Sequence, residues 1–220
     1  MLDGESEEEF SRYRAKYTGN KWGGKYLRAP DIFFTILEKG KGKLVRLGDI
    51  AEIKTGIITG LNKKFYQLIQ YPIPQGYELV FKSPKEVSKI LLRRTDAINM
   101  IMIQNIPFHL KRAPLLWPDL RGNKHLVHFN PDNLLFEHNF YGIIPPSKYC
   151  LLTCALLNLT LIAFIFEVLT RRGLGGGAAR LVKIDIISFP CINPAIFTNK
   201  QYLNLLQVFN KMAGSVNTLV

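Results

Sequence analysis

The sequence predicts an α/β fold: a mixed, mostly antiparallel sheet or a distorted barrel, with one long helix packed along it. Short apolar runs separated by prolines occupy residues 96–146, as is typical of strands joined by long loops. Residues 151–170 form an apolar run of helical length, and residues 199–212 have the apolar spacing of a closing helix. The chain has 220 residues, of which 47% are hydrophobic, so one compact domain with its own core is expected.

The first part of the chain alternates helix and strand signals. Pro30, followed by an acidic residue and apolar side chains, predicts a helix that ends at the glycines of 40–42. Residues 44–53 combine a short strand with a turn. Residues 54–68 then place two glycines in a polar loop, which leads into a strand over 65–69.

The middle of the chain favours strands. Prolines and a glycine break the chain before a strand over 77–81, and the sequence SPKE at 83–86 opens a helix to about Leu92. Further strands are expected at 99–103, 126–129 and 139–144. The stretch 103–133 has too little periodicity to be mainly core, and long irregular segments are often functional.

A glycine cluster, RRGLGGGAAR, follows the long helix at 171–180. A phosphate-binding loop needs strand, glycines and helix in that order, but here a helix precedes the glycines and an alternating strand over 180–189 follows them. The cluster therefore predicts a structural turn at a helix C-terminus. Its glycines are Gly173, Gly175, Gly176 and Gly177. In a second interpretation, Arg171, Arg180 and Lys183 also reach DNA phosphates from this turn.

The charge balance favours an anionic partner. Lys and Arg number 29 against 17 Asp and Glu, which gives a net charge of +12. Five of the acids lie in the first nine residues, so residues 10–220 carry all 29 basic side chains against 12 acidic ones, a net charge of +17. A chain this basic attracts phosphates, and nucleic acid is the first partner to consider.

Cysteines and histidines argue against metal binding and catalysis. The spacing of Cys150, Cys154 and Cys191 fits neither a disulfide framework nor a zinc site, and it favours a reducing cytoplasm. His125-x-x-His128 is the nearest approach to a ligand pair, but it lacks the second pair that zinc needs. No GxSxG motif is present, and Cys150 has no evident histidine partner. An autonomous enzyme is not expected.

No membrane partner is expected either. The N-terminus is acidic and polar, unlike a signal peptide. The run 151–169 is long enough to span a bilayer, but it contains Glu167 and several polar residues, and a buried charge in lipid is costly. A buried core helix is therefore the favoured interpretation.

Basic residues recur beside aromatic or hydrogen-bonding neighbours, as on a surface that contacts phosphates. In KTGIITGLNKK at 54–64, two glycines and a threonine let backbone amides approach one run of phosphates together with two lysines. The predicted phosphate contacts are Lys54, Lys63, Lys64, Lys82 and Lys85. The loop residues Thr55, Gly56, Thr59, Gly60 and Asn62 complete the predicted DNA-backbone set.

Base reading is expected from the loops within 96–135. The candidates are Gln104, Arg112, Arg121, Asn123 and Lys124. Their chemistry suits the task, since Arg and Lys pair with guanine edges, and Asn and Gln pair with adenine edges.

Several segments, in order, resemble one family: the C-terminal target recognition domain of adenine-specific DNA methyltransferases, including the fused type IIG restriction–modification enzymes. The segments are KWGGKYLRAP (21–30), LGDIAEIKTGIITGLNKKFYQL (47–68), FKSPKEV (81–87), NFYGIIPP (139–146), LLTCALLNLTL (151–161) and GLGGGAARLVKIDIISFPCINP (173–194). By this similarity, Gly56, Thr59, Gly60 and Asn62 correspond to the family's glycine-threonine-asparagine loop. The glycines of 173–180 correspond to its helix-to-strand turn.

The sequence departs from a whole enzyme of that family. Such an enzyme carries a methyltransferase domain with a glycine-rich cofactor loop and an Asn/Asp-Pro-Pro-Tyr/Phe motif, and this chain has neither; NPDN at 130–133 and IPPS at 144–147 do not fit the motif. The resemblance therefore implies no catalytic residue, metal or cofactor in this chain, with S-adenosylmethionine bound by a missing methyltransferase domain. Residues 1–19 are then an acidic lead-in, as the stub of that domain, and 20–220 the recognition domain.

The resemblance implies sequence-specific binding of double-stranded DNA, which positions a methyltransferase domain, and in type IIG systems a nuclease, on its target. An alternative from another class is a protein–protein docking module of a restriction–modification complex. Such a module would use the glycine turn and the closing helix to hold its partner.

Overall fold

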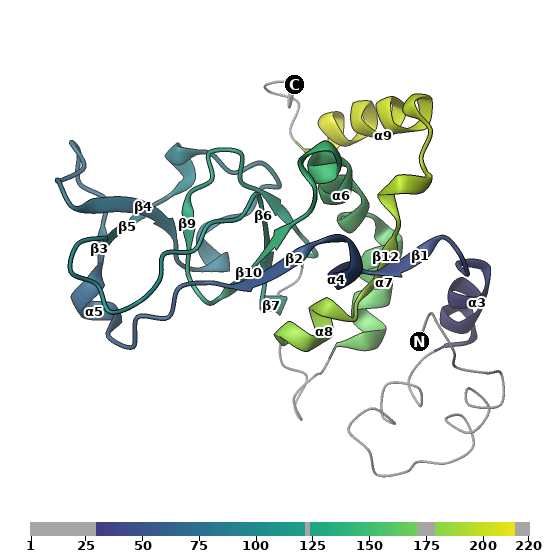
Figure 1. The fold of residues 1–220 in the computed structure, drawn as a ribbon, viewed down its shortest axis with the longest axis horizontal. Coiled ribbons are helices and arrows are strands. Elements are labelled where there is room, and N and C mark those ends of the chain that lie inside the picture. Colours follow the sequence, from purple (N-terminus) through teal and green to yellow (C-terminus); the bar gives the residue numbers. More distant parts are fainter. Residues whose placement is uncertain (1–29, 122–123, 171–178, 214–220) are drawn as a thin grey trace, which may run out of the picture.

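A computed structural model describes residues 30–121, 124–170 and 179–213 (Figure 1). The molecule is elongated, with one end built of strands and the other of helices. The expected acidic lead-in and the four turn glycines lie outside the described residues.

Four strands form a central sheet in the order β2-β10-β6-β8, and each neighbouring pair is antiparallel. They are β2 (Glu52–Thr55), β10 (Phe140–Ile144), β6 (Leu115–Pro118) and β8 (His128–Phe129). Successive side chains of a strand point to opposite faces. Leu115 and Trp117 of β6 accordingly belong to one buried cluster and Leu116 to another, so the sheet separates two cores.

A second four-stranded sheet, in the order β3-β5-β4-β9, lies at one end of the molecule (Figure 1). Its strands are β3 (Tyr66–Leu68), β5 (Asn99–Met102), β4 (Tyr77–Phe81) and β9 (Leu135–Phe136). β4 and β9 are parallel, and the other two pairs are antiparallel. The short helix α5 (Asn62–Phe65) leads directly into β3. We call α5 and this sheet the strand-built end.

Helices cover the opposite end, which we call the helix-built end (Figure 1). Its helices are α3 (Asp31–Lys39), α6 (Cys150–Leu157), α7 (Thr160–Leu169) and α9 (Asn199–Met212), beside the strand pair β1 (Leu44–Arg46) and β12 (Pro190–Ile192). The remaining elements are α4 (Leu47–Ile50), α8 (Lys183–Ile187), the pair β7 (Leu120–Arg121) and β11 (Ala179–Arg180), and the 3-10 turns η1 (Pro84–Glu86), η2 (Arg94–Asp96), η3 (Ser147–Tyr149) and η4 (Pro194–Ile196).

The predicted fold class is confirmed: the chain is α/β, and its sheets are mostly antiparallel. In the described part of the chain, the strands form open sheets rather than a closed barrel. The closing helix is also confirmed. Thr198 caps α9, because its Oγ1 accepts from the backbone N of Gln201 at 3.4 Å while the Gln201 side chain accepts from the backbone N of Thr198 at 3.0 Å.

The predicted single helix over 151–170 is wrong, because the chain bends by 72° between α6 and α7. Asn158 ends α6: its side-chain amide donates to the carbonyls of Cys154 at 2.9 Å and Val127 at 2.8 Å, and its Oδ1 accepts from the backbone N of Val127 at 3.0 Å. Leu159 is extended. The break therefore depends on a partner far away in the sequence, which an apolar pattern does not reveal.

The predicted helix over 83–92 is also wrong, because it stops after the single turn η1. The backbone N of Leu92 donates to the carbonyl of Phe129 at 2.8 Å, and the backbone N of Phe129 donates to that of Ile90 at 2.7 Å. Pairing with a distant strand therefore holds the segment extended, in spite of its helix-opening signal.

The predicted strand over 180–189 is replaced by α8 between two short strands. Asp185 Oδ2 accepts from the backbone N of Val182 at 3.2 Å and so satisfies a donor at the start of the helix.

The stretch 103–133, which was not expected to be mainly core, contributes β6 to the core. Trp117 is 2% exposed, and its ring centroid lies 6.0 Å from that of Phe166 and 5.1 Å from that of Phe189. These rings join the largest buried cluster, which lies between the central sheet and the helix-built end.

Candidate nucleic-acid interface

The glycine loop at 55–61 is anchored by backbone contacts to the segment after β9. The backbone N of Ile57 donates to the carbonyl of Phe136 at 2.9 Å, and the backbone N of His138 donates to the carbonyl of Ile57 at 3.0 Å. A Cβ on Gly56 would lie 2.2 Å from the carbonyl oxygen of Glu137. Glycine is therefore required there, because two backbones cross too closely for a side chain.

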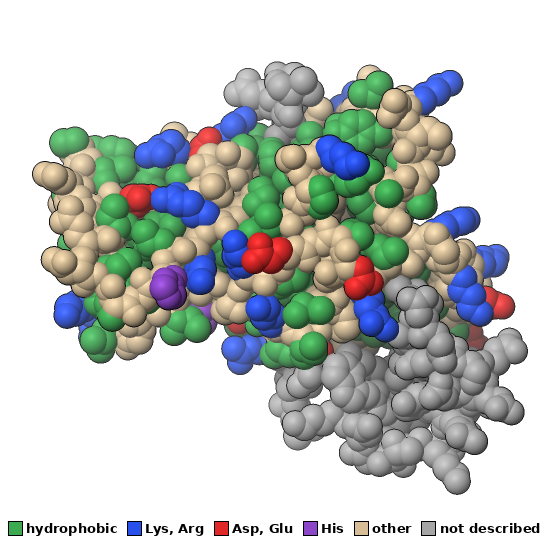
Figure 2. Space-filling view, in the orientation of Figure 1, with side chains coloured by type: hydrophobic (Ala, Val, Ile, Leu, Met, Phe, Trp, Pro, Cys, Tyr) green, Lys and Arg blue, Asp and Glu red, His purple; other side chains and the backbone are tan. Residues whose placement is uncertain are grey.

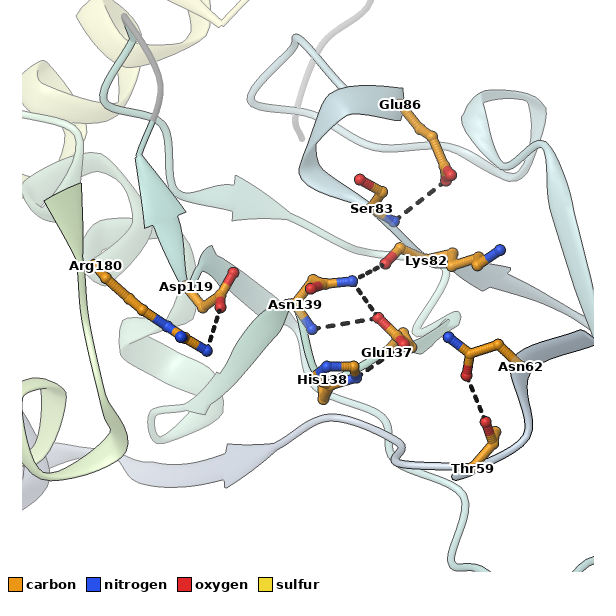
Figure 3. Close-up of polar contacts among 10 residues, drawn as sticks. All are labelled: Thr59, Asn62, Lys82, Ser83, Glu86, Asp119, Glu137, His138, Asn139 and Arg180. Carbon is orange, nitrogen blue, oxygen red and sulfur yellow. Dashed lines mark hydrogen bonds and ion pairs between the residues drawn. The ribbon is translucent and has the colours of Figure 1, made fainter. Parts of the chain in front are cut away.

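The tip of the loop is closed by its own side chains. Thr59 Oγ1 donates to Asn62 Oδ1 at 2.6 Å, and Gly60 has φ +70°, a left-handed conformation that favours glycine (Figure 3). The chain then enters α5, where Lys63 and Lys64 are exposed. The turn thus holds two lysines at the surface of the strand-built end.

Glu137 is the centre of the polar contacts behind this loop. Its side chain is 1% exposed, and its Oε1 lies 2.8 Å from Nδ1 of His138. Its Oε2 accepts from the backbone N of Asn139 at 3.4 Å and also from the Asn139 side-chain amide. That amide also donates to the carbonyl of Lys82 at 3.0 Å, so Asn139 links the Glu137 carboxylate to the segment after β4 (Figure 3).

The electrostatics of this cluster follow from its burial. Burial raises the pKa of the Glu137 carboxyl, while the positive fields of His138 and Lys82 oppose the rise. Burial, and next the nearby Glu137 carboxylate, raise the pKa of the Tyr66 hydroxyl. Tyr66 Oη has no hydrogen-bond partner within the described residues, and Lys82 Nζ lies 5.4 Å from the centre of the Tyr66 ring.

The predicted phosphate contacts have different surroundings. Lys54 on β2 pairs with Glu52 at 3.4 Å, and Lys82 lies over the Tyr66 ring. Lys64 Nζ lies 5.3 Å from the centre of the Phe65 ring. Lys85 is exposed on η1, and Thr55 is half-buried on β2. Figure 3 shows Thr59, Asn62 and Lys82 in one close-up with the Glu137–His138 pair, so the structure brings these predicted residues together.

The predicted base readers are less uniform. Gln104 is exposed after β5, beside Gly76, and Lys124 is exposed. Arg112 forms an ion pair with Glu78, and its Nη1 also donates to the carbonyl of Asn133 at 2.9 Å.

The other two candidates flank a gap in the described chain. Arg121 lies in β7, where its backbone is opposite Ala179 of β11, and Asn123 falls outside the described residues. Base reading by these five residues stays a prediction.

Glu137, His138 and Asn139 are functional candidates that the sequence motifs do not single out. They lie in the run LLFEHNF, where a charged residue interrupts an apolar segment. That interruption is a usable signal, because a charge inside a buried run needs a partner.

Basic side chains are spread over the face drawn in Figure 2 in separate groups, interspersed with hydrophobic and neutral surface. Across residues 30–121, 124–170 and 179–213, no group of three or more His, Cys, Asp and Glu is placed to hold a metal ion. In the same ranges no single helix is long and apolar enough to cross a membrane, and the bent pair that runs from Ser147 to Leu169 passes that test only as a pair.

The chain was compared with protein-family models, curated proteins and solved structures, and matches were found among the solved structures. No protein-family model matches the chain, and no curated protein matches it. Among solved structures, the chain is similar to the HsdS subunit from Thermoanaerobacter tengcongensis, with a TM-score of 0.38 and 11% sequence identity. The match covers 79% of this chain and 40% of that one, so this chain spans well under half the length of that subunit.

Proposed function

We propose that this chain binds double-stranded DNA at a specific sequence and so positions an adenine-specific methyltransferase of a restriction–modification system. The observation that carries the proposal is the anchored glycine loop, which holds Lys63 and Lys64 exposed on a chain with a net charge of +12. No carboxylate within 4.0 Å neutralises either lysine in the described part of the chain. Exposed cations on a rigid support are what phosphate binding requires.

In this proposal the phosphates position the protein and the loops read the bases. The backbone N–H groups of the glycine loop, with Lys63, Lys64 and Lys82, contact consecutive phosphates. Exposed Gln104 and Lys124 reach base edges, and Arg112 does so only by leaving its ion pair with Glu78. Residues 20–220 are the recognition domain.

The chemistry of methyl transfer belongs to the parent enzyme, which carries the S-adenosylmethionine site and, in a type IIG system, the nuclease. The described part of this chain supplies recognition. We place the assembly in the cytoplasm, which agrees with the three free cysteines, of which Cys154 and Cys191 are buried.

The second candidate function is docking to a partner protein. It is favoured by the outer surface of α9, where Leu203 is 64% exposed and Val208 66% exposed. An apolar hollow beside α3, lined by Ile32, Ile36 and Leu161 among others, adds to the exposed hydrophobic surface of the helix-built end.

A mobility-shift experiment with the 220-residue chain separates the two functions. A long duplex of mixed sequence is titrated at about 50 mM and about 200 mM salt. About five phosphate contacts predict a slope of log affinity against log salt near −4.5, a loss of several hundredfold. No shift at the lower salt, or a flat salt response, contradicts DNA binding and leaves the docking function.

A further inference from the structure

Two buried carboxylates, Glu137 behind the glycine loop and Asp119 directly after β6, each hold a basic side chain at the surface. Glu137, 1% exposed, lies 2.8 Å from the ring of His138, which is 43% exposed. Asp119, 6% exposed, lies 3.7 Å from the guanidinium of Arg180, which is 65% exposed. Figure 3 shows both pairs in one view. In each pair the acid is buried and the base faces solvent.

Asn139 joins the two pairs. Its backbone N donates to Glu137 at 3.4 Å, and its carbonyl accepts from the backbone N of Asp119 at 2.9 Å. The backbone N of Leu181, next to Arg180, donates to the carbonyl of Asp119 at 2.9 Å. A short set of backbone bonds therefore fixes His138 and Arg180 relative to each other, although they are far apart in the sequence.

The burial of the acids has a chemical consequence. A carboxylate removed from water is costly unless a donor or cation compensates it. When the His138 ring carries both protons, Nδ1–H donates to Glu137 and the opposite Nε2–H is left as a donor for an external acceptor. Arg180 contacts Asp119 through one nitrogen at a long 3.7 Å, and a guanidinium carries five N–H donors. Each base thus keeps capacity for an external hydrogen-bond acceptor.

We propose that His138 and Arg180 together bind hydrogen-bond acceptors of duplex DNA, with Glu137 and Asp119 as their positioning residues. This inference rests on the proposed function. The acceptors are either phosphate oxygens or the N7 and O6 atoms of a guanine, which offer the same chemistry to an Arg and a His. The site adds two DNA-binding side chains to those of the loop lysines and extends the interface toward β11.

The test compares His138→Ala and Arg180→Ala with two matched controls in the full chain. Lys200→Ala removes one exposed positive charge, and Gln207→Ala removes one exposed neutral side chain, both from α9 at the helix-built end. The binding of each to the same duplexes is measured at two salt concentrations. We expect each site variant to bind roughly tenfold more weakly than the wild type, the loss expected of one good contact, and each control to stay within about twofold.

The two sources of acceptor give different patterns. A guanine contact relaxes the preference at one base pair in a selection on randomised duplexes, whereas a phosphate contact weakens all sequences alike and lowers the salt slope by roughly 1. Either pattern supports the site. Binding by both site variants that equals the controls overturns it while leaving the proposed function intact. A wild-type chain that binds no duplex overturns the proposed function and this site together.

A folding check keeps the test decisive. Thermal unfolding of every variant is followed in the binding buffer. If Arg180→Ala unfolds because Asp119 loses its partner, Arg180→Gln keeps a donor for that carboxylate and removes the charge. The same roughly tenfold loss is expected for Arg180→Gln, and wild-type binding by this variant overturns the role of Arg180.

Discussion

The two ends of the molecule are stabilised in different ways. The helix-built end contributes to the largest buried cluster, where aromatic rings pack around Trp117 and most side chains of α6 are buried. The strand-built end contributes to two smaller clusters, one around Val80 and one around Phe81, and backbone pairing joins its short strands. The second kind of construction leaves side chains free to face solvent. The helix-built end therefore contributes most to the largest core, and the candidate phosphate-binding loop lies at the strand-built end.

The largest expected effect on the unfolding free energy comes from a substitution in the largest buried cluster. Trp117→Ala removes a 2% exposed ring that packs on Phe166 and Phe189, so it is expected to cost about 3–5 kcal/mol of unfolding free energy. Urea unfolding followed by circular dichroism measures it. Tyr71→Ala at the strand-built end is the control, because that ring is 74% exposed, and about 0.5 kcal/mol or less is expected. Equal losses would contradict the packing of the Trp117 ring in the largest buried cluster.

The second effect is a pH dependence from the central sheet. Burial lowers the pKa of His128 to about 4 from its usual 6.5, although the bond of its Nδ1 to the carbonyl of Lys89 opposes the shift. Between these two values the unfolded chain binds a proton that the folded chain does not. Stability from this group is therefore complete above pH 6.5 and is lost as the pH falls toward 4, by about 3 kcal/mol.

Urea unfolding at pH 7 and at pH 4.5 measures this loss. His128→Asn keeps a donor for the carbonyl of Lys89 and does not titrate, so its stability is expected to fall less over the same window. A parallel fall in both proteins would mean that carboxylates, and not His128, set the response.

The third effect concerns two glycines of one loop. Gly56→Ala drives a Cβ into the backbone of Glu137 and is expected to cost about 1–3 kcal/mol and to displace the loop. A Cβ added by Gly60→Ala would have no atom within 4 Å, so the only expected cost is that of the positive φ, about 1 kcal/mol of unfolding free energy. Unfolding and DNA binding are both measured, and the larger loss of each is expected for Gly56→Ala. The reverse order would contradict the anchoring of the loop by Glu137.

The smallest effect on stability, with a large effect on binding, is expected from the exposed lysines. Replacing Lys63 and Lys64 together by Ala should change the unfolding free energy by no more than about 0.5 kcal/mol. DNA binding should weaken about equally on all sequences, and the salt slope should fall by roughly 1 for each phosphate that is no longer neutralised. If only the preferred sequence suffered, these lysines would be base readers instead of phosphate-binding residues.

The sequence predicted correctly those elements that are determined by neighbouring residues in the chain. The capping box of Thr198 and Gln201 and the apolar spacing that follows are visible in the sequence, and α9 has the predicted bounds. Ser83 and Glu86 form a capping box as well, but the helix ends after one turn because residues 90–92 form backbone hydrogen bonds with Phe129 of β8. Asn158 breaks the long helix for the same kind of reason, because its partner Val127 comes from another segment.

The candidate site likewise has one part that the sequence reveals and one part that depends on contacts between distant segments. The glycine loop and its lysines are visible as a motif, since glycines, a threonine and basic residues lie next to one another in the chain. The Glu137–His138 pair is not, because its meaning depends on the backbone of residue 57 crossing at Glu137 and on Asp119 lying beside Asn139. The charge inside the apolar run 134–140 marks the position in the sequence, but the partners of Glu137 are known only from the fold.

Sequence-specific DNA recognition is tested by a binding selection with the wild-type chain on a pool of randomised duplexes. If the chain recognises a specific sequence, successive rounds enrich one short motif, and the enriched duplex binds more tightly than the starting pool by about a thousandfold or more. A pool that stays random after repeated rounds, with equal affinity for every recovered duplex, would contradict it.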